Sequence, residues 1–306
     1  MEKTVVLDGY NARETKDILS IQKKKTRLSD DVLYVLIYLS ASISVILLIG
    51  IIGYVFIKGI REVNWTFLSS VTSALKGTTG IAGNILNTIY IILLTLLVAA
   101  PIGIGSAIYL NEYAKPGKIV KIIEFTTETL AGIPSIVFGL FGMMFFGNTL
   151  GLGYSLLTGA LTLAIMVLPL ITRNTQEALK RVPDSYRNGA LGMGATKWYM
   201  IRTILLPSAM PGIVTGIILA IGRIVGESAA LLFTAGSGYL LPKTGMGYLH
   251  KILESGGTLT IQLYLSMSKG QYNIAFGIAV VLLAIVLVIN MITKVLAGKL
   301  DVTRKN

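Results

Sequence analysis

Two charged residues interrupt one of the long apolar runs of this sequence. Arg223 and Glu227 lie within Ile213–Phe233, and a spacing of four residues puts both side chains on one face of a helix, one turn apart. On insertion scales each such ion costs roughly 2.5 to 3.5 kcal/mol at the centre of a membrane helix, so both must face protein or water. Two interpretations stay open: an ion pair that neutralises itself within a bundle, or a hydrophilic point on a path through the membrane.

The second interpretation implies a ligand with defined chemistry. Arg223 would offer a planar fork of hydrogen-bond donors to an oxyanion, and Glu227 would accept a hydroxyl hydrogen from it. Hydrogen phosphate has both features, whereas fully ionised sulfate lacks the hydroxyl. The pair therefore favours phosphate, and other oxyanions remain open.

The elements that must position this pair are membrane-spanning helices. The chain has 306 residues, of which 53% are hydrophobic and 14% charged, which is too little polar surface to coat a soluble globule of this size. Several charge-poor runs are long enough to cross ~30 Å of hydrocarbon at about 1.5 Å per residue. We expect an all-α, polytopic membrane helix bundle. The six predicted spans are Leu33–Ile57, Ile85–Leu110, Leu130–Phe146, Tyr154–Ile171, Ile213–Phe233 and Ile274–Val295.

The distribution of Lys and Arg predicts the orientation of these spans. The net charge is +12, and the basic residues gather before the first span, after the second and fourth, and at the carboxyl end. The positive-inside bias then places both termini in the cytoplasm of a multi-pass protein of the cell membrane. Because these residues flank apolar spans and form no aromatic-studded face, we expect membrane lipid and no nucleic acid as a partner.

The remaining composition limits the chemistry. There is no cysteine and one histidine, His250, so the sequence offers no disulfide, no thiolate nucleophile and no cysteine or histidine metal cluster. An intramembrane enzyme would have to use Arg223, Glu227 and His250, but no Ser-His or paired-carboxylate arrangement supports it. A proton-coupled secondary transporter working through Glu227 is a further alternative, weakened by the lack of a second intramembrane carboxylate.

Two loops carry signals of their own. The glycine-rich stretch 235–273 predicts either a surface-packed segment facing an external partner or an irregular connector. The long loop after the fourth span predicts two short helices broken at Gly194, with Asp184 or Ser185 capping the first and Thr196 the second. Pro207 and the proline four residues later should stop or kink the second helix before the fifth span.

Such a protruding pair of helices has two interpretations. It could seat in a groove of a soluble partner and convert that partner's closure into movement of the attached spans. It could instead lie on the bilayer as an amphipathic helix, which Trp198 and Tyr199 beside Lys197 and Arg202 would favour.

The register of this loop resembles the cytoplasmic motif of ABC importer permeases. That motif reads Glu-Ala-Ala, three residues, Gly, nine residues, Ile, one residue, Leu-Pro, and Gly194, Ile204, Leu206 and Pro207 match it. The Glu-Ala-Ala positions depart from it, and shape contacts of the following apolar residues are expected to hold the partner instead of the family's glutamate. The resemblance assigns ATPase coupling to Asn188, Gly189, Ala190, Leu191, Met193, Gly194, Ala195, Ile204, Leu206 and Pro207.

Two further strings narrow the resemblance. Gly222–Ala235, with Arg223 and Glu227 four apart, resembles the fifth-span signature of phosphate importer permeases, and Leu130–Gly139 resembles their third-span entry. The ending Leu-Leu-Phe-Thr at Leu231–Thr234 is closer to the PstA-type subunit than to its PstC-type partner.

The resemblance implies a type I ABC importer permease architecture. The implied layout is a cytoplasmic tail at 1–32, a first span at 33–57, a permease core at 83–297 containing the coupling segment 174–207, and a cytoplasmic tail at 298–306. It also implies a PstC-type permease, two cytoplasmic ATPase subunits and an external phosphate-binding protein as partners. With no Gly-rich loop ending in Gly-Lys-Ser or Gly-Lys-Thr, this chain is expected to be no enzyme and to bind no cofactor, ATP and Mg²⁺ being held by the partners. A sulfate or molybdate permease is the nearest alternative.

Overall fold

The computed structural model describes residues 28–73, 78–242 and 247–300, and the chain divides into two units, residues 1–54 and 55–306. Helix α2 (Leu28–Gly59) makes up the described part of the first unit and runs into the second. Its stretch Asp31–Gly59 is mostly exposed and is long and apolar enough to cross a membrane, in agreement with the first predicted span. Most of the predicted tails, residues 1–27 and 301–306, lie outside the described residues.

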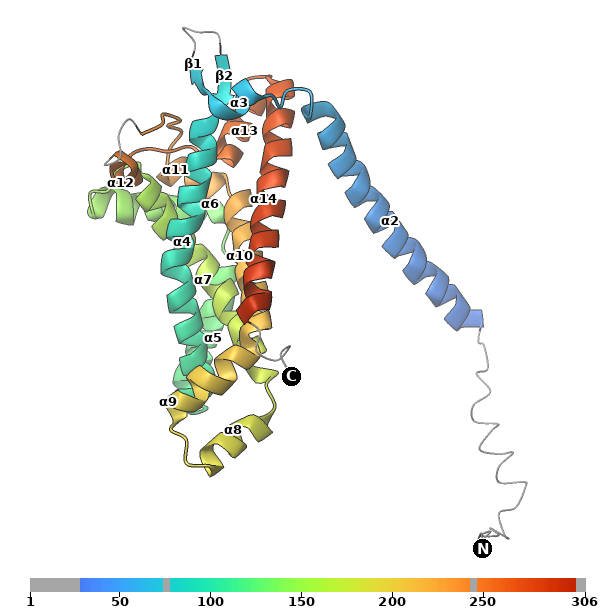
Figure 1. The fold of residues 1–306 in the computed structure, drawn as a ribbon, viewed down its shortest axis with the longest axis vertical. Helices are drawn as coiled ribbons and strands as arrows, with labels where there is room; N and C mark the ends of the chain where they lie inside the picture. Colours follow the sequence, from blue (N-terminus) through green and yellow to red (C-terminus); the bar gives the residue numbers. More distant parts are fainter. Residues whose placement is uncertain (1–27, 74–77, 243–246, 301–306) are drawn as a thin grey trace, which may run out of the picture. The chain divides into compact units, whose positions relative to one another are not determined.

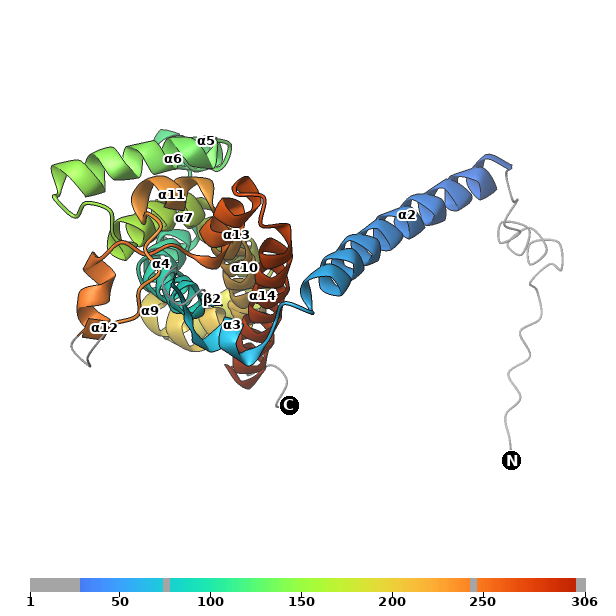
Figure 2. The same cartoon turned by 90° about the horizontal axis from the view of Figure 1, so that it is seen from above.

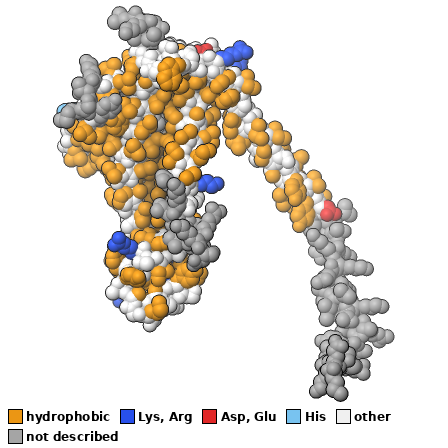
Figure 3. All heavy atoms as spheres, in the orientation of Figure 1, with side chains coloured by type: hydrophobic (Ala, Val, Ile, Leu, Met, Phe, Trp, Pro, Cys, Tyr) orange, Lys and Arg blue, Asp and Glu red, His pale blue; other side chains and the backbone are white. Residues whose placement is uncertain are grey.

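The second unit is a bundle of helices (Figures 1 and 2). Its long helices are α4 (Ala82–Ile108), α7 (Leu156–Lys180), α10 (Leu206–Gly226) and α14 (Tyr272–Leu300). Helix α7 packs on α4 and α10, and α10 packs on α14. About two thirds of the apolar part of α7 is buried, so α7 is the central helix of the bundle. The outer flank of the bundle is largely hydrophobic (Figure 3).

The spanning helices agree with the predicted fold class. Among the described residues, five helices are long and apolar enough to cross a membrane, or six if one bent pair counts as a span. The core that joins them is aliphatic and includes Ile91 of α4, Leu163 and Val167 of α7, and Ile224 of α10, each at most 1% exposed. An all-α membrane bundle is therefore confirmed.

The predicted span Leu130–Phe146 does not form one continuous helix, because Gly132-Ile133-Pro134 interrupts it. Helix α5 (Lys118–Ala131) ends there, α6 (Ser135–Gly142) follows, and the two are bent by 101°. The bend falls where Pro134 supplies no backbone donor and disfavours a helical conformation in the residue before it. A π-helical turn, η2 (Met143–Thr149), completes this region.

The predicted limits of the fifth span are also wrong. Helix α10 ends at Gly226, and a separate short helix, α11 (Ala229–Thr234), follows. At the other end, α9 (Lys197–Met200), a π-helical turn η3 (Ile201–Leu205) and α10 form one helical run of 30 residues. Pro207 does not stop this run, because the wider π turn precedes it and its missing donor falls in the first turn of α10.

The glycine-rich stretch after α11 is packed and is no loose connector. It contains α12 (Gly247–His250), the 3-10 turn η4 (Lys251–Leu253) and α13 (Leu259–Ser268). Two buried asparagines of α4 hold it: Asn84 Nδ2 donates to Gly257 O at 2.9 Å, and Asn87 Nδ2 donates to Gly238 O at 2.9 Å. Residues 243–246 of the stretch lie outside the described residues.

A small hairpin lies at the same end of the second unit as this stretch (Figure 1). It consists of α3 (Trp65–Ser69) and the antiparallel strands β1 (Val71–Ser73) and β2 (Thr78–Ile81), with Val71 opposite Ile81. The two helices of the coupling segment lie at the opposite end, so the chain presents a different structure at each end of the bundle.

Candidate functional site

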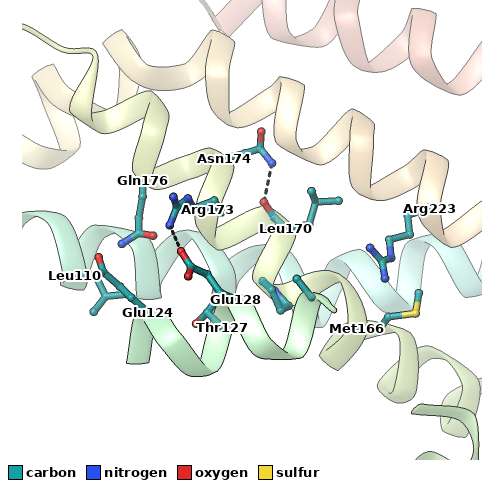
Figure 4. A pocket seen from close by; sticks show the side chains of 12 residues that line it. Leu110, Glu124, Thr127, Glu128, Met166, Leu170, Arg173, Asn174, Gln176 and Arg223 are labelled. Atoms are coloured by element: carbon teal, nitrogen blue, oxygen red, sulfur yellow. Dashed lines mark hydrogen bonds and ion pairs between the residues drawn. The ribbon is translucent and has the colours of Figure 1, made fainter. Parts of the chain in front are cut away.

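Arg223 lies in the last turn of α10 and points into a cavity (Figure 4). It lies beside Met166, which is ten residues into α7, so it is level with the middle of that helix although its own helix ends nearby. The residue is exposed and makes no hydrogen bond or ion pair with any other described residue. A guanidinium in this state keeps all its donors available.

The helical face that Arg223 and Glu227 were predicted to share is absent. The helix stops at Gly226, and Glu227 has an extended backbone (φ −80°, ψ 124°), so the two side chains do not share a helical face. Glu227 Oε1 instead accepts a hydrogen bond from Ala230 N at 3.0 Å. Its carboxylate therefore caps the start of α11, a favourable place for a negative charge.

The cavity that Arg223 lines has a volume of about 320 Å³ and lies between α5, α7 and α10. Its other polar lining residues are Glu124, Thr127, Glu128, Arg173, Asn174 and Gln176. Sequence reasoning missed all six, because they come from α5 and from a stretch of α7 that had been predicted as a loop. The fourth span was expected to end at Ile171, whereas α7 continues to Lys180.

Charges are paired in one part of the cavity and unpaired in another. Arg173 Nη1 lies 3.1 Å from Glu128 Oε1, and Arg173 Nε lies 3.5 Å from Glu177 Oε1. Glu124, like Arg223, has no hydrogen bond or ion pair with another described residue. The cavity thus contains one free cation and one free carboxylate among the residues that the structure describes.

The coupling segment has the break and one of the caps expected of it. Helix α8 (Asp184–Gly192) precedes Gly194, whose φ of +82° lies in the region that favours glycine. Thr196 Oγ1 accepts from Tyr199 N at 3.3 Å and caps α9, as predicted. The cap expected from Asp184 or Ser185 is wrong, because α8 has no side-chain cap; Asp184 Oδ1 instead accepts from Arg187 Nη1 at 3.0 Å.

The residues of the matched motif divide between the core and the surface. Ala190 is 4% exposed and packs in a cluster with Met200, Ile201 and Leu205, so its expected contact with a partner is wrong. Ile204 and Leu206 are half-buried against the same cluster, and Pro207 and Ala195 are also half-buried.

Exposed members of the segment form its outer surface. Met193 is 88% exposed and Leu191 48%, and Trp198 and Tyr199 are exposed beside them. Asn188, Gly189 and Gly194 are exposed as well. Large apolar side chains on a protruding tip indicate an interaction surface.

Arg187 is a contact point that the sequence did not reveal. Its side chain is 16% exposed and lies 3.0 Å from the carboxylate of Glu112, which is 5% exposed. It also donates to the carbonyl oxygens of Leu179 at 2.9 Å and Val182 at 2.8 Å. Glu112 belongs to η1 (Tyr109–Tyr113), a π-helical turn that continues α4, so the pair ties α8 to the end of α4.

A lysine strengthens the same tie. Lys197 Nζ donates to the carbonyl oxygen of Glu112 and lies 4.9 Å from the centre of the Tyr113 ring. Arg187 and Glu112 are 75 positions apart in the sequence, which is why no local pattern indicates the contact.

The sequence matches known families and proteins. A family described as "binding-protein-dependent transport system inner membrane component" matches residues 99–303. The chain is 39% identical over 198 residues to the probable ABC transporter permease protein YqgI of Bacillus subtilis, which covers 65% of this chain and 67% of that protein. It is 34% identical over 228 residues to phosphate transport system permease protein PstA 1 of Mycobacterium tuberculosis, covering 74% and 68%.

Solved structures share the fold. A bacterial alginate ABC transporter, solved with its alginate-bound periplasmic protein, has a chain that matches with a TM-score of 0.66 at 16% identity, covering 95% of this chain and 99% of that one. A chain of the methionine transporter MetNI matches with a TM-score of 0.54 at 19% identity, covering 72% and 94%. At such identities the likeness concerns the fold alone.

Proposed function

Because the chain belongs to the family of binding-protein-dependent transport system inner membrane components, we propose that it is the permease subunit of an ABC importer that carries inorganic phosphate. Relatives named phosphate transport system permease protein PstA, at 34 to 37% identity, support a PstA-type subunit. Because the chain belongs to this permease family, we set aside the two alternatives from the sequence, an intramembrane enzyme and a proton-coupled secondary transporter.

The observation that carries an oxyanion substrate is the unpaired Arg223 in a cavity, because a guanidinium presents a planar fork of donors to an oxyanion. Unpaired Glu124 lines the other end of the same cavity (Figure 4), where its carboxylate would accept the hydroxyl hydrogen of a hydrogen phosphate that has moved along the cavity. Glu227 no longer fits the second role, since it caps α11. Sulfate and molybdate remain the competing substrates, because they can use the guanidinium but carry no hydroxyl for a carboxylate.

The proposal includes a set of partners and an orientation. A PstC-type permease would complete the path, two ATPase subunits would bind ATP and Mg²⁺ in the cytoplasm, and an external phosphate-binding protein would deliver the substrate. The coupling segment and both termini would face the cytoplasm, as the Lys and Arg distribution favours.

The helical run from Lys197 to Gly226 connects the surface proposed to bind the ATPase with the residue proposed to bind the substrate. It begins at the exposed tip near Trp198 and carries Arg223 at its other end, about 39 Å away at 1.5 Å per residue. An ATPase that moves the tip would therefore move Arg223 with it. The contact of Arg187 with Glu112 would bring α4 into the same movement.

Substitution of Arg223 tests the proposal. In the complete transporter in proteoliposomes, Arg223→Gln should abolish uptake of radiolabelled phosphate while the complex still assembles, because the free guanidinium has no structural partner to lose. Lys294→Gln, an exposed cation of α14 outside the cavity, is the matched control. Unchanged uptake by the Arg223 variant would reject the substrate role, and uptake of labelled sulfate in preference to phosphate would reject the substrate.

A further inference from the structure

A second arginine lines the cavity on the side of the coupling segment. Arg173 lies seven residues after Met166 on α7, about 10 Å further along the helix at 1.5 Å per residue (Figure 4). Its guanidinium meets Glu128 of α5 at 3.1 Å. The two side chains therefore join the two walls of the cavity at a point beyond Arg223.

The contact between these walls is easily opened. The side chains of Arg173 and Glu128 are 54% and 63% exposed, and exposed ion pairs contribute little to stability. A carboxylate is itself an oxyanion, so Glu128 Oε1 occupies a place where an oxygen of a phosphate could lie. A hydrogen phosphate offers more acceptor oxygens to the guanidinium fork than this single contact does.

An adjoining amide supplies independent support. Gln176 lies three residues after Arg173 on the same helix, is 5% exposed and lines the cavity. It has no hydrogen-bond partner among the described residues, although buried amides are usually satisfied. A buried amide without a partner, on the wall of a cavity that contains two arginines, is a group that a ligand would complete.

We propose that Arg173 and Gln176 form a second oxyanion site, between Arg223 and the helices α8 and α9 of the coupling segment, which Glu128 occupies when no substrate is present. The anion leaves Arg223, displaces the Glu128 carboxylate from Arg173, and is released when Glu128 returns. This inference rests on the proposed function, since it takes the same ligand through the same cavity.

Separate substitutions of Arg173 and Glu128 distinguish an anion-binding site from an ion pair that only holds the structure together. In the complete transporter in proteoliposomes, Arg173→Gln should lower uptake of radiolabelled inorganic phosphate by about tenfold or more, because a charge-assisted donor is lost. Glu128→Gln removes the competitor from the facing wall and leaves the exposed Glu177 beside Arg173, so uptake should stay within about twofold of the unchanged protein or rise. Lys121→Gln, an exposed cation of α5 outside the cavity, is the control.

A structural bridge would be broken equally by either change, so equal losses in Arg173→Gln and Glu128→Gln would overturn the inference. Normal uptake by Arg173→Gln would also overturn it. If Arg223→Gln abolishes uptake while Arg173→Gln does not, the second site fails and the proposed function stands. If neither change matters, the proposed function fails too. Gln176→Leu, of similar volume, should lower uptake severalfold with assembly unchanged, and a normal rate would count against the role of the amide.

Discussion

Two arginines in this chain occupy opposite situations. Arg187, in the coupling segment, is nearly buried and has two carboxylates and two carbonyl oxygens within hydrogen-bonding distance. Arg223, at the end of α10, is exposed in a cavity and has no polar partner among the described residues. A saturated guanidinium holds structure, whereas an unsaturated one can bind a ligand. Under the proposed function, the first belongs to the part of the permease that the ATPase moves and the second to the substrate path.

The largest effect on stability is expected from Arg187→Gln. The change would leave Glu112 buried without its cation, and breaking a buried pair costs about 3 to 5 kcal/mol. Thermal unfolding of the purified complex should occur at clearly lower temperature. Arg181→Gln, an exposed cation near the end of α7, should leave the transition where it is. Equal transitions for the two variants would show that Arg187 is no more structural than an ordinary surface residue.

A smaller loss is expected from Gly194→Val. At φ +82° a β-branched residue is strained, at a cost of about 1 to 2 kcal/mol, and the turn between α8 and α9 should shift. Substrate-dependent ATP hydrolysis should fall with it, which can be measured on the reconstituted transporter. Gly192→Ala is the control, since Gly192 is helical and a Cβ there would meet nothing within 4 Å. Coupling retained in the valine variant would mean that the geometry of this turn is not needed.

Loss of the cap on α9 should matter less again. Thr196→Ala removes the acceptor for Tyr199 N, and a lost N-cap costs about 1 kcal/mol. Thr196→Ser keeps the hydroxyl and should restore stability in the same thermal measurement. If alanine and serine behaved alike, the hydroxyl would not be a cap.

Of these substitutions, Arg223→Gln should lower the thermal stability least, although it should lower phosphate uptake most. Because the guanidinium has no described partner, Arg223→Gln should unfold at the temperature of the unchanged protein. A large drop in that temperature would place Arg223 with Arg187 as a structural residue and would remove the contrast between them.

Local signals predicted the parts of this molecule that local forces determine. Charge-poor runs predicted where the apolar helices lie, and the glycine and threonine at positions 194 and 196 predicted a break and a cap. The end of α10 was missed because nothing in Gly226 and Glu227 forbids a helix. The chain stops being helical there as Glu227 caps the next helix.

Contacts between distant parts of the chain were beyond sequence reasoning. Arg187 meets a carboxylate 75 positions away, and Arg173 meets one 45 positions away. The motif match also gave no information on which of its residues face inwards, so that Ala190 was expected at a surface although it packs in the chain's own core. Burial on a short helix depends on the elements packed against it, which the motif does not contain.

The tip of the coupling segment and Arg223 lie on one helical run, Lys197–Gly226, and the proposed coupling requires this run to move as a rigid body. The chain has no cysteine, so spin labels can be placed at Tyr199→Cys and Leu219→Cys, both exposed positions of the run. Their separation, about 30 Å at 1.5 Å per residue, can be measured by pulsed electron spin resonance in the complete transporter with and without ATP. If the run moves as a rigid body, the distance is the same in both states while uptake proceeds. A change of several ångströms on ATP binding would contradict it, because the run would then bend instead of carrying Arg223.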